Sequence, residues 1–316
     1  MTRPRLDTHA KGVFVISATP FQDSGALDLD STDRLIEFYL DKGVSGITIL
    51  GMMGEAPKLS PAESSLFLNH VLARVDGRVP VVVGVSNAGL GGLAHLSHEA
   101  MAAGAAGVMV APMPSLKTEE QLLNYYRAVC AALGPDVPIV LQDFPLTLGV
   151  HFSVPTIERI AGEHPQIVML KHEDWPGLTK LSRLRAGMAE GKRRLSILVG
   201  NGGLFLPQEL ARGADGAMTG YAYPEMLVAV VQLVAAGETD RAEDLFDAHL
   251  PIIRHETQPG LGLAIRKEIL RRRGAIASAH VRAPGPKLDA TDHAELDRLM
   301  YRLDRRLAEL GWRRED

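Results

Sequence analysis

The sequence predicts an α/β protein that folds as a (β/α)8 TIM barrel with a C-terminal helical appendage. Eight short apolar runs, rich in β-branched residues, alternate with eight segments of helical periodicity over about 225 residues. The runs are continuous rather than alternating, which is typical of parallel strands that are covered on both faces. The connections are short, and 316 residues, of which 46% are hydrophobic, suffice for the core of one large barrel.

Strands and helices are expected to alternate along the chain. We predict strands at residues 12–19, 45–50, 79–85, 107–111, 138–142, 167–171, 196–199 and 216–219. The helices are expected to begin at residue 31 and then to span residues 61–75, 93–103, 119–133, 154–163, 178–190, 204–212 and 224–236. An open doubly wound sheet is the alternative. It usually has a glycine-rich dinucleotide turn early in the chain, whereas the first strand here ends in Thr19-Pro20-Phe21.

The domain boundary is predicted after the eighth strand-helix unit. We assign residues 1–237 to the barrel and residues 238–316 to a helical region packed on it. Helices are expected near residues 241–255, 262–273 and 291–310, where the apolar positions form single stripes that need a covering surface.

Composition excludes several functional classes. The formal net charge of −4 gives no electrostatic basis for binding nucleic acid, and the arginines at 271–273 and 302–306 are expected on solvated helix faces or subunit contacts. Cys130 is the single cysteine, so a disulfide framework and a thiolate zinc site are excluded, and we expect a buried thiol. The longest apolar stretch, 226–236, is far shorter than the roughly 20 residues that span a bilayer. Residues 1–11 lack an apolar core of signal-peptide length, so we expect a cytoplasmic protein with no membrane contact.

The run at residues 167–171 ends at Lys171, which is followed by three further ionisable residues. An ordinary lysine at the end of a strand reaches solvent. Barrel enzymes, however, place their chemistry at the carboxyl ends of strands, and Lys171 ends the sixth strand. There it can act as an amine nucleophile that forms a Schiff base with a carbonyl substrate.

Motifs at several strand ends resemble those of one enzyme family. They are Thr19-Pro20-Phe21, Gly51-Met52-Met53-Gly54-Glu55, Ala111-Pro112, Lys171, Gly200-Asn201-Gly202 and Asp215-Gly216-Ala217. In this order and spacing they resemble the dihydrodipicolinate synthase / N-acetylneuraminate lyase family of class I aldolases, over residues 12 to 310. The resemblance implies that Lys171 condenses with the ketone of pyruvate or another 2-oxo acid, without a cofactor. It also implies a homo-oligomer, since the family is commonly a tetramer built from dimers.

The chain departs from the family at the proton relay. Where the family has Gly-Thr-Thr-Gly-Glu, this chain has Met52 and Met53, and where it has Tyr-Asn-x-Pro, this chain has Gln142-Asp143-Phe144-Pro145. The arginine that many dihydrodipicolinate synthases use beyond that proline is absent from residues 146–149, and Pro114 replaces a frequent tyrosine. These changes indicate a divergent lyase, either an aldolase or a dehydratase. We expect it to act on a 2-oxo acid that is more apolar than the family's sugar acids. We do not expect it to synthesise dihydrodipicolinate.

The missing proton shuttle must come from another residue near a strand end. Strand alternation directs His172 and Asp143 toward the helices if Lys171 and Gln142 point into the barrel, which favours structural roles for the first two. Glu173 shares the parity of Lys171, and Tyr221 remains a further candidate. We therefore expect Lys171, Gln142 and Glu173 to be catalytic. The substrate-binding residues are expected to be Met52, Met53, Gly54, Thr147, Met218 and Gly200.

Other interpretations remain open at this point. A metal-dependent barrel lyase or hydrolase would use Asp143, Glu173 and Asp174 as oxygen ligands. A non-catalytic descendant would bind a small acid without turning it over. The pair His95 and His98 lacks a third metal ligand near it in the sequence and is expected on the surface, and the glycine-rich stretch 84–92 is expected to be a tight loop. Glu55 is expected to bond the backbone of its own loop.

Overall fold

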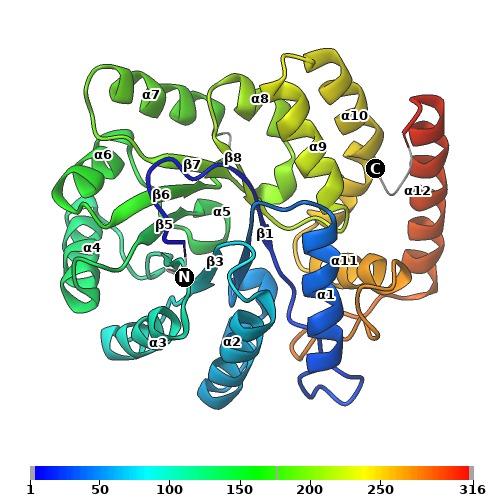
Figure 1. Ribbon diagram of the computed structural model, residues 1–316, viewed down its shortest axis with the longest axis horizontal. Coiled ribbons are helices and arrows are strands. Elements are labelled where there is room, and N and C mark those ends of the chain that lie inside the picture. The colour runs from blue at the N-terminus through cyan, green and yellow to red at the C-terminus, as the bar shows by residue number, and fades with distance from the viewer. Residues whose placement is uncertain (1–3, 176, 313–316) are drawn as a thin grey trace.

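The protein is a closed parallel barrel with helices around it, and its computed structural model describes residues 4–175 and 177–312 (Figure 1). Within these residues the strands pair in sequence order, and β1 pairs with β8 to close the barrel. The strands are β1 (Gly12–Ile16), β2 (Gly46–Ile49), β3 (Val81–Gly84), β4 (Gly107–Val110), β5 (Ile139–Asp143), β6 (Ile167–His172), β7 (Ser196–Val199) and β8 (Gly216–Thr219). The predicted TIM barrel is confirmed.

Helices cover the outside of the barrel, and short helical turns follow several strands. The outer helices are α1 (Leu29–Asp41), α2 (Pro61–Val75), α3 (Leu90–Ala103), α4 (Glu119–Leu133), α6 (Val154–Glu163), α7 (Leu178–Ala189), α8 (Leu206–Ala211) and α9 (Pro224–Ala235). The short turns are η1 (Met52–Gly54), η2 (Ala56–Lys58), α5 (Pro145–Leu148) and η3 (Asn201–Gly203). The C-terminal helices are α10 (Thr239–Glu256), α11 (Gly262–Arg272) and α12 (Ala290–Glu309).

Alternation along the strands separates two apolar cores. Side chains that point inward, such as Phe14, Met169 and Met218, fill the barrel interior. Those that point outward, such as Ile47 and Leu170, pack under the helices. The expected continuous apolar strands are explained by these two buried faces.

The sequence placed helix ends most accurately where capping residues mark them. Helix α2 follows a capping box in which Ser60 and Glu63 satisfy each other's backbone N–H groups. Helix α3, in contrast, begins at Leu90 with no side-chain cap. The prediction that all of residues 84–92 form a loop is therefore wrong, since Gly91 and Gly92 lie inside the first turn of this helix.

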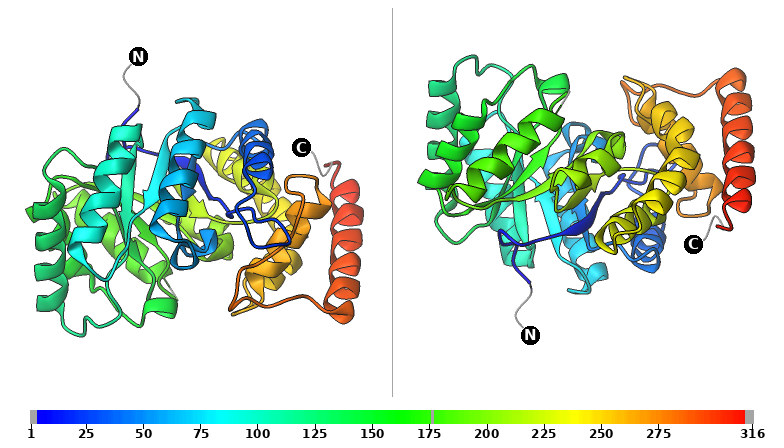
Figure 2. Two further views of the ribbon diagram at one scale, coloured as in Figure 1. Left: turned by 90° about the horizontal axis from the view of Figure 1, so that it is seen from below. Right: turned by 90° about the horizontal axis from the view of Figure 1, so that it is seen from above.

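The C-terminal helices extend from one side of the barrel, with α12 standing outside α10 and α11 at the edge of the molecule opposite α4 (Figures 1 and 2). The segment after α11 returns to the barrel, where Arg282 donates to the carbonyl of Lys58 in η2 at 2.9 Å. None of the helices in the described ranges is both long and apolar enough to cross a membrane.

Candidate active site

The carboxyl ends of β5 and β6 bring three polar side chains together inside the barrel. Gln142 and Lys171 are partners in the parallel register of these strands. Lys171 Nζ lies 3.1 Å from Glu173 Oε2, and Gln142 Nε2 donates to the same oxygen at 2.7 Å. All three side chains are buried. The expectation that Glu173 lies on the same side as Lys171 is therefore met by a direct contact.

The position of Glu173 is fixed from three directions. Its backbone N–H donates to the carbonyl of Asp143 at 2.8 Å, and its carbonyl accepts from Asn201 Nδ2 at 3.0 Å. Its side chain lies against Gly200, where a Cβ would overlap the Glu173 Cγ. Position 200 thus needs a glycine because the carboxylate passes over it.

The three residues form a buried pair of opposite charges with one neutral hydrogen-bond donor. The Lys171 amine can attack a carbonyl group, and a carboxylate at this distance can carry protons to and from the resulting imine. The amide of Gln142 does not titrate, so it holds the carboxylate without competing for the proton. This arrangement provides a nucleophile and an adjacent proton carrier.

The turn after β2 closes one side of the barrel mouth. Met52, Met53 and Gly54 form η1, and Met53 packs against the interior core. The Gly54 carbonyl accepts from Thr19 Oγ1 at 2.6 Å, and its N–H donates to the carbonyl of Gly51 at 3.0 Å. Both backbone groups of Gly54 are therefore already bonded.

Glu55 anchors this turn, but the prediction that its side chain bonds the backbone of its own loop is wrong, because its carboxylate faces the C-terminal region instead. It adopts a left-handed conformation with φ of 55°. Its carboxylate contacts Lys267 Nζ at 2.5 Å and Lys58 Nζ at 2.8 Å, and it accepts from the backbone N–H of Arg282 at 3.0 Å. Burial lowers the pKa of Lys267 to about 8, although Glu55 opposes this shift. Glu55 thus joins the β2 turn to the C-terminal region.

The other expected binding residues lie at different depths. Thr147 is exposed on α5, whereas Met218 is buried in the barrel interior as the register partner of Phe14. Met52 and Met53 are both half-buried. Substrate contacts by these residues and by Gly200 stay predictions.

Two of the candidate proton carriers point away from Lys171, as strand alternation predicts. Asp143 Oδ2 accepts from Lys180 Nζ of α7 at 2.6 Å, and His172 Nε2 faces the carbonyl of Gly177 at 3.0 Å. Tyr221 also turns outward, where its hydroxyl contacts His249 Nδ1 of α10 at 2.8 Å.

These orientations also correct the metal-site alternative. Asp143 and Glu173 lie on opposite faces of the sheet, while Asp174 contacts Lys180 at 3.1 Å. The three carboxylates therefore do not converge on one point.

Sequence reasoning missed two residues that support the site. Asn201 was part of a recognised motif, but its bond to the Glu173 carbonyl crosses between two loops. Lys180 carried no signal beyond its place in the first turn of α7. Cys130 is buried as predicted, and burial raises the pKa of its thiol to about 12.

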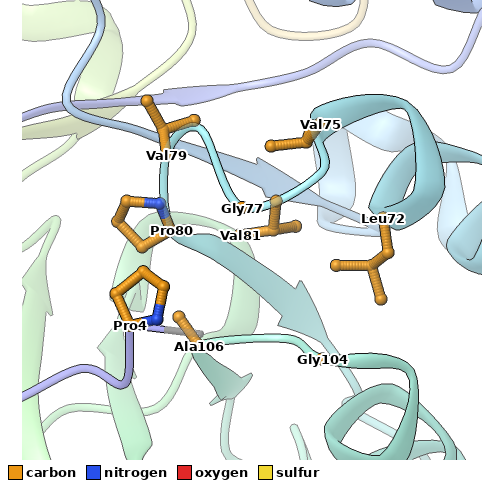
Figure 3. A pocket seen from close by; sticks show the side chains of 9 residues that line it. All are labelled: Pro4, Leu72, Val75, Gly77, Val79, Pro80, Val81, Gly104 and Ala106. Atoms are coloured by element: carbon orange, nitrogen blue, oxygen red, sulfur yellow. The ribbon is translucent and has the colours of Figure 1, made fainter. Parts of the chain in front are cut away.

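A small cavity lies at the opposite end of the barrel (Figure 3). Its lining includes Val81, which begins β3, and Ala106, which precedes β4, so it marks the amino ends of the strands. Its volume of about 10 Å³ is close to that of a single water site. The cavity is too small for a 2-oxo acid.

A buried lysine at the carboxyl end of a barrel strand, with a carboxylate beside its Nζ, is an arrangement that suits a Schiff-base lyase. The family model of the dihydrodipicolinate synthetase family matches residues 9–302. The chain belongs to this family and is a lyase.

Two curated relatives illustrate the range of activities in the family. The chain is 34% identical over 312 residues to an L-2-keto-3-deoxyarabonate dehydratase from Azospirillum brasilense, with 96% of this chain and 97% of the relative covered. It is 35% identical to a 4-hydroxy-tetrahydrodipicolinate synthase from Sorangium cellulosum, with 77% of this chain and 78% of the relative covered.

Solved structures agree with the fold over nearly the whole chain. A dihydrodipicolinate synthase from Rhodopseudomonas palustris matches with a TM-score of 0.93 and 50% identity, covering 95% of this chain and 99% of that one. A prophage protein of the same family from E. coli K12, solved in complex with pyruvate, matches with a TM-score of 0.84 and 26% identity, covering 93% and 98%.

Proposed function

We propose that the protein is a dehydratase that removes water from a 2-keto-3-deoxy sugar acid through a Schiff base on Lys171. The observation that carries this proposal is the 3.1 Å contact between Lys171 Nζ and Glu173 Oε2 in a buried site. The similarity to an L-2-keto-3-deoxyarabonate dehydratase over 96% of the chain supports it, and for this reason the proposal replaces the more apolar 2-oxo acid that Met52 and Met53 suggested.

The proposed reaction uses Glu173 twice. The Lys171 amine attacks the C2 ketone, and loss of water gives a protonated imine. Glu173 then removes a proton from C3, and the electron pair forms an enamine. The enamine electrons expel the C4 hydroxyl group, which receives a proton from Glu173 and leaves as water. Hydrolysis of the resulting unsaturated imine releases the product and restores the amine.

The absence of the family's relay favours elimination over aldol chemistry. In elimination the proton leaves C3 and returns to an oxygen on the next carbon, so a single short-range carrier suffices. Aldol cleavage needs a base for the C4 hydroxyl group, which the family resemblance assigns to the tyrosine and threonine relay. This chain has Gln142 and Met53 at those positions.

The synthase reaction is disfavoured by the second substrate. Residues 146–148 carry Leu-Thr-Leu where many synthases have an arginine, and Leu146 is exposed on α5. An incoming carboxylate would thus lose hydration without gaining a cationic partner. We expect backbone N–H groups of η1 to hold the carboxylate of the actual substrate, because this contact needs no side chain, and we expect Met52 and Met53 to lie against its carbon chain.

The direct test is to incubate the protein with L-2-keto-3-deoxyarabonate and follow both possible outcomes. Loss of one water, seen by mass spectrometry and by proton NMR, is expected. Release of pyruvate, detected with lactate dehydrogenase, would instead identify an aldolase. A homo-oligomeric assembly and a cytoplasmic location remain part of this proposal, and gel filtration with light scattering tests the first of them.

A further inference from the structure

A second set of charged side chains lies on the outer face of β5 and β6, directly behind Gln142 and Lys171. We call Asp143, His172, Asp174 and Lys180 the outer cluster. Asp143 Oδ2 contacts Lys180 Nζ at 2.6 Å and lies 3.6 Å from His172 Nδ1, while Lys180 Nζ also contacts Asp174 Oδ2 at 3.1 Å. The proposed mechanism does not use any of these groups.

The contacts of His172 favour the doubly protonated imidazolium. Its Nε2 lies 3.0 Å from the carbonyl of Gly177, which can only accept a hydrogen bond. With that proton on Nε2, a neutral ring would turn the lone pair of Nδ1 toward the carboxylate of Asp143. A second proton on Nδ1 removes this repulsion and forms a charge pair.

The charged groups around His172 come from four elements. Asp143 belongs to β5, Lys180 to α7, Glu209 to α8, and Asp174 to the loop after β6. Burial lowers the pKa of His172, but hydrogen bonding and charge from Asp143, with a further bond to Gly177, outweigh this and leave the pKa raised.

Glu209 is a further titratable group near His172. Burial raises its pKa to about 7, although the charge of His172 opposes this shift. It therefore has to be controlled in any test of His172.

The imidazole ring spans the loop that carries Glu173. Residue 172 precedes Glu173, and the ring bonds back to the carbonyl of Gly177 at the start of α7. A Cβ at position 177 would overlap the His172 Nε2, so the ring lies directly against the Gly177 backbone. The carbonyl of His172 also accepts from Gly200 N at 2.9 Å, and Gly200 is the residue over which the Glu173 side chain lies.

We propose that the His172 imidazolium, held by Asp143, is a positioning residue that fixes the Glu173 carboxylate beside Lys171. This inference rests on the proposed role of Glu173 as the proton carrier. If His172 loses its contacts, the Lys171 amine stays in place on its strand, but the Glu173 carboxylate can move. Imine formation is then retained, whereas proton transfer slows. Misplacement of a catalytic group by about 1 Å can cost about 10²-fold in rate.

The test separates these two steps with pyruvate as the probe. Borohydride trapping, measured by intact mass, reports the imine on Lys171. Exchange of the pyruvate methyl protons with deuterium, measured by NMR, reports proton transfer at C3. His172→Gln retains a donor but cannot become charged. We expect it to keep trapping and to lose about 10²-fold in exchange.

The pH profile gives a readout that a merely structural role would not change. Below the raised pKa of His172 the ring is charged, so the wild-type exchange rate is expected to fall as pH rises through that pKa. Asp143→Asn removes the counter-charge and is expected to move this fall to lower pH. His172→Gln is expected to have no such fall, while Glu209→Gln is expected to keep it.

Several outcomes decide the proposal. Wild-type exchange rates in a folded His172→Gln protein, or an unmoved pH profile in Asp143→Asn, overturn it. If Asp143→Asn does not fold, Gly177→Ala displaces the ring instead and must slow exchange relative to trapping. His98→Gln changes a remote, exposed histidine that also faces a carbonyl group, and it should leave both assays unchanged.

The variant Glu173→Gln separates a failure of the proposed function from a failure of the positioning role of His172. Undiminished exchange in this variant overturns the proposed function and this inference together. Loss of exchange in Glu173→Gln, with normal exchange in His172→Gln, overturns only the positioning role.

Discussion

Replacement of Glu173 by glutamine is the most informative single change in the site. The substitution keeps the shape of the side chain, and the new carbonyl oxygen can still accept from Gln142 Nε2 in place of the 2.7 Å bond to Oε2. It removes the proton carrier and the negative charge that lies 3.1 Å from Lys171 Nζ. The fold should persist, because the bond from the residue 173 N–H to the Asp143 carbonyl and the bond from Asn201 Nδ2 to the residue 173 carbonyl do not depend on the charge of this side chain.

The expected loss of turnover in Glu173→Gln follows from the proposed role of the carboxylate as the proton carrier. General acid–base catalysis by one positioned group contributes about 10²- to 10⁴-fold in rate. At about 1.4 kcal/mol per factor of ten, this corresponds to about 3–5 kcal/mol of transition-state stabilisation. Glu173→Gln should therefore lose turnover by about 10²- to 10⁴-fold, while the Lys171 amine, freed from its counter-ion, still forms an imine.

Two measurements on the same preparation decide the matter. Steady-state dehydration gives the loss in kcat, and borohydride trapping with pyruvate gives the fraction of Lys171 that forms the imine. Turnover within about tenfold of the wild type would show that another group carries the proton. Loss of trapping in parallel with turnover would show that Glu173 acts before the imine rather than after it.

Three further predictions follow from the structure. Lys171→Ala should abolish trapping and turnover without lowering the melting temperature, because the apolar strands carry the core; retained turnover would exclude the Schiff base. Met53→Thr combined with Gln142→Tyr should not produce dihydrodipicolinate synthase activity, because residues 146–148 still lack the arginine; in an assay with pyruvate and aspartate semialdehyde, turnover of about 1 to 10³ per second would contradict this. Burial, with the charge of Arg273, lowers the pKa of His249 to about 3 from 6.5, so the unfolded state binds more protons between these values. The free energy of unfolding should thus fall by about 1.4 kcal/mol per pH unit as pH decreases through this window, and His249→Gln should lower the slope in denaturant titrations.

The sequence predicted the barrel well because its strands carry a local signal. Continuous apolar runs mark strands that are buried on both faces, and capped helices such as α2 and α4 were placed at their observed ends. The four-residue helix α5 was missed, because a single turn after Pro145 has no periodicity to detect. The division between residues 237 and 238 stays a prediction.

The sequence predicted the orientation of the site residues only along β6 and the residue that follows it. Parity placed Glu173 on the side of Lys171 and His172 on the other, and the contacts agree with both placements. The bond from Gln142 to Glu173 depends on the register between β5 and β6, and the bond from Asn201 depends on how two loops meet. Neither relation is encoded in local spacing, so sequence reasoning named Gln142 without its partner.

The absence of the family's relay gives the proposed role of Glu173 a physical basis. A tyrosine at position 142 would place a titrating phenol where the Gln142 amide now donates to Glu173 Oε2. Two groups that exchange protons would then compete beside one imine. An amide removes this competition and leaves the carboxylate as the single proton carrier within the inward cluster. The proposed proton carrier then lies on the segment after β6 rather than on β5, where the family resemblance places the tyrosine of the relay. The proposed nucleophile, positioning histidine and proton carrier are the consecutive residues 171, 172 and 173, so a single peptide segment sets their geometry.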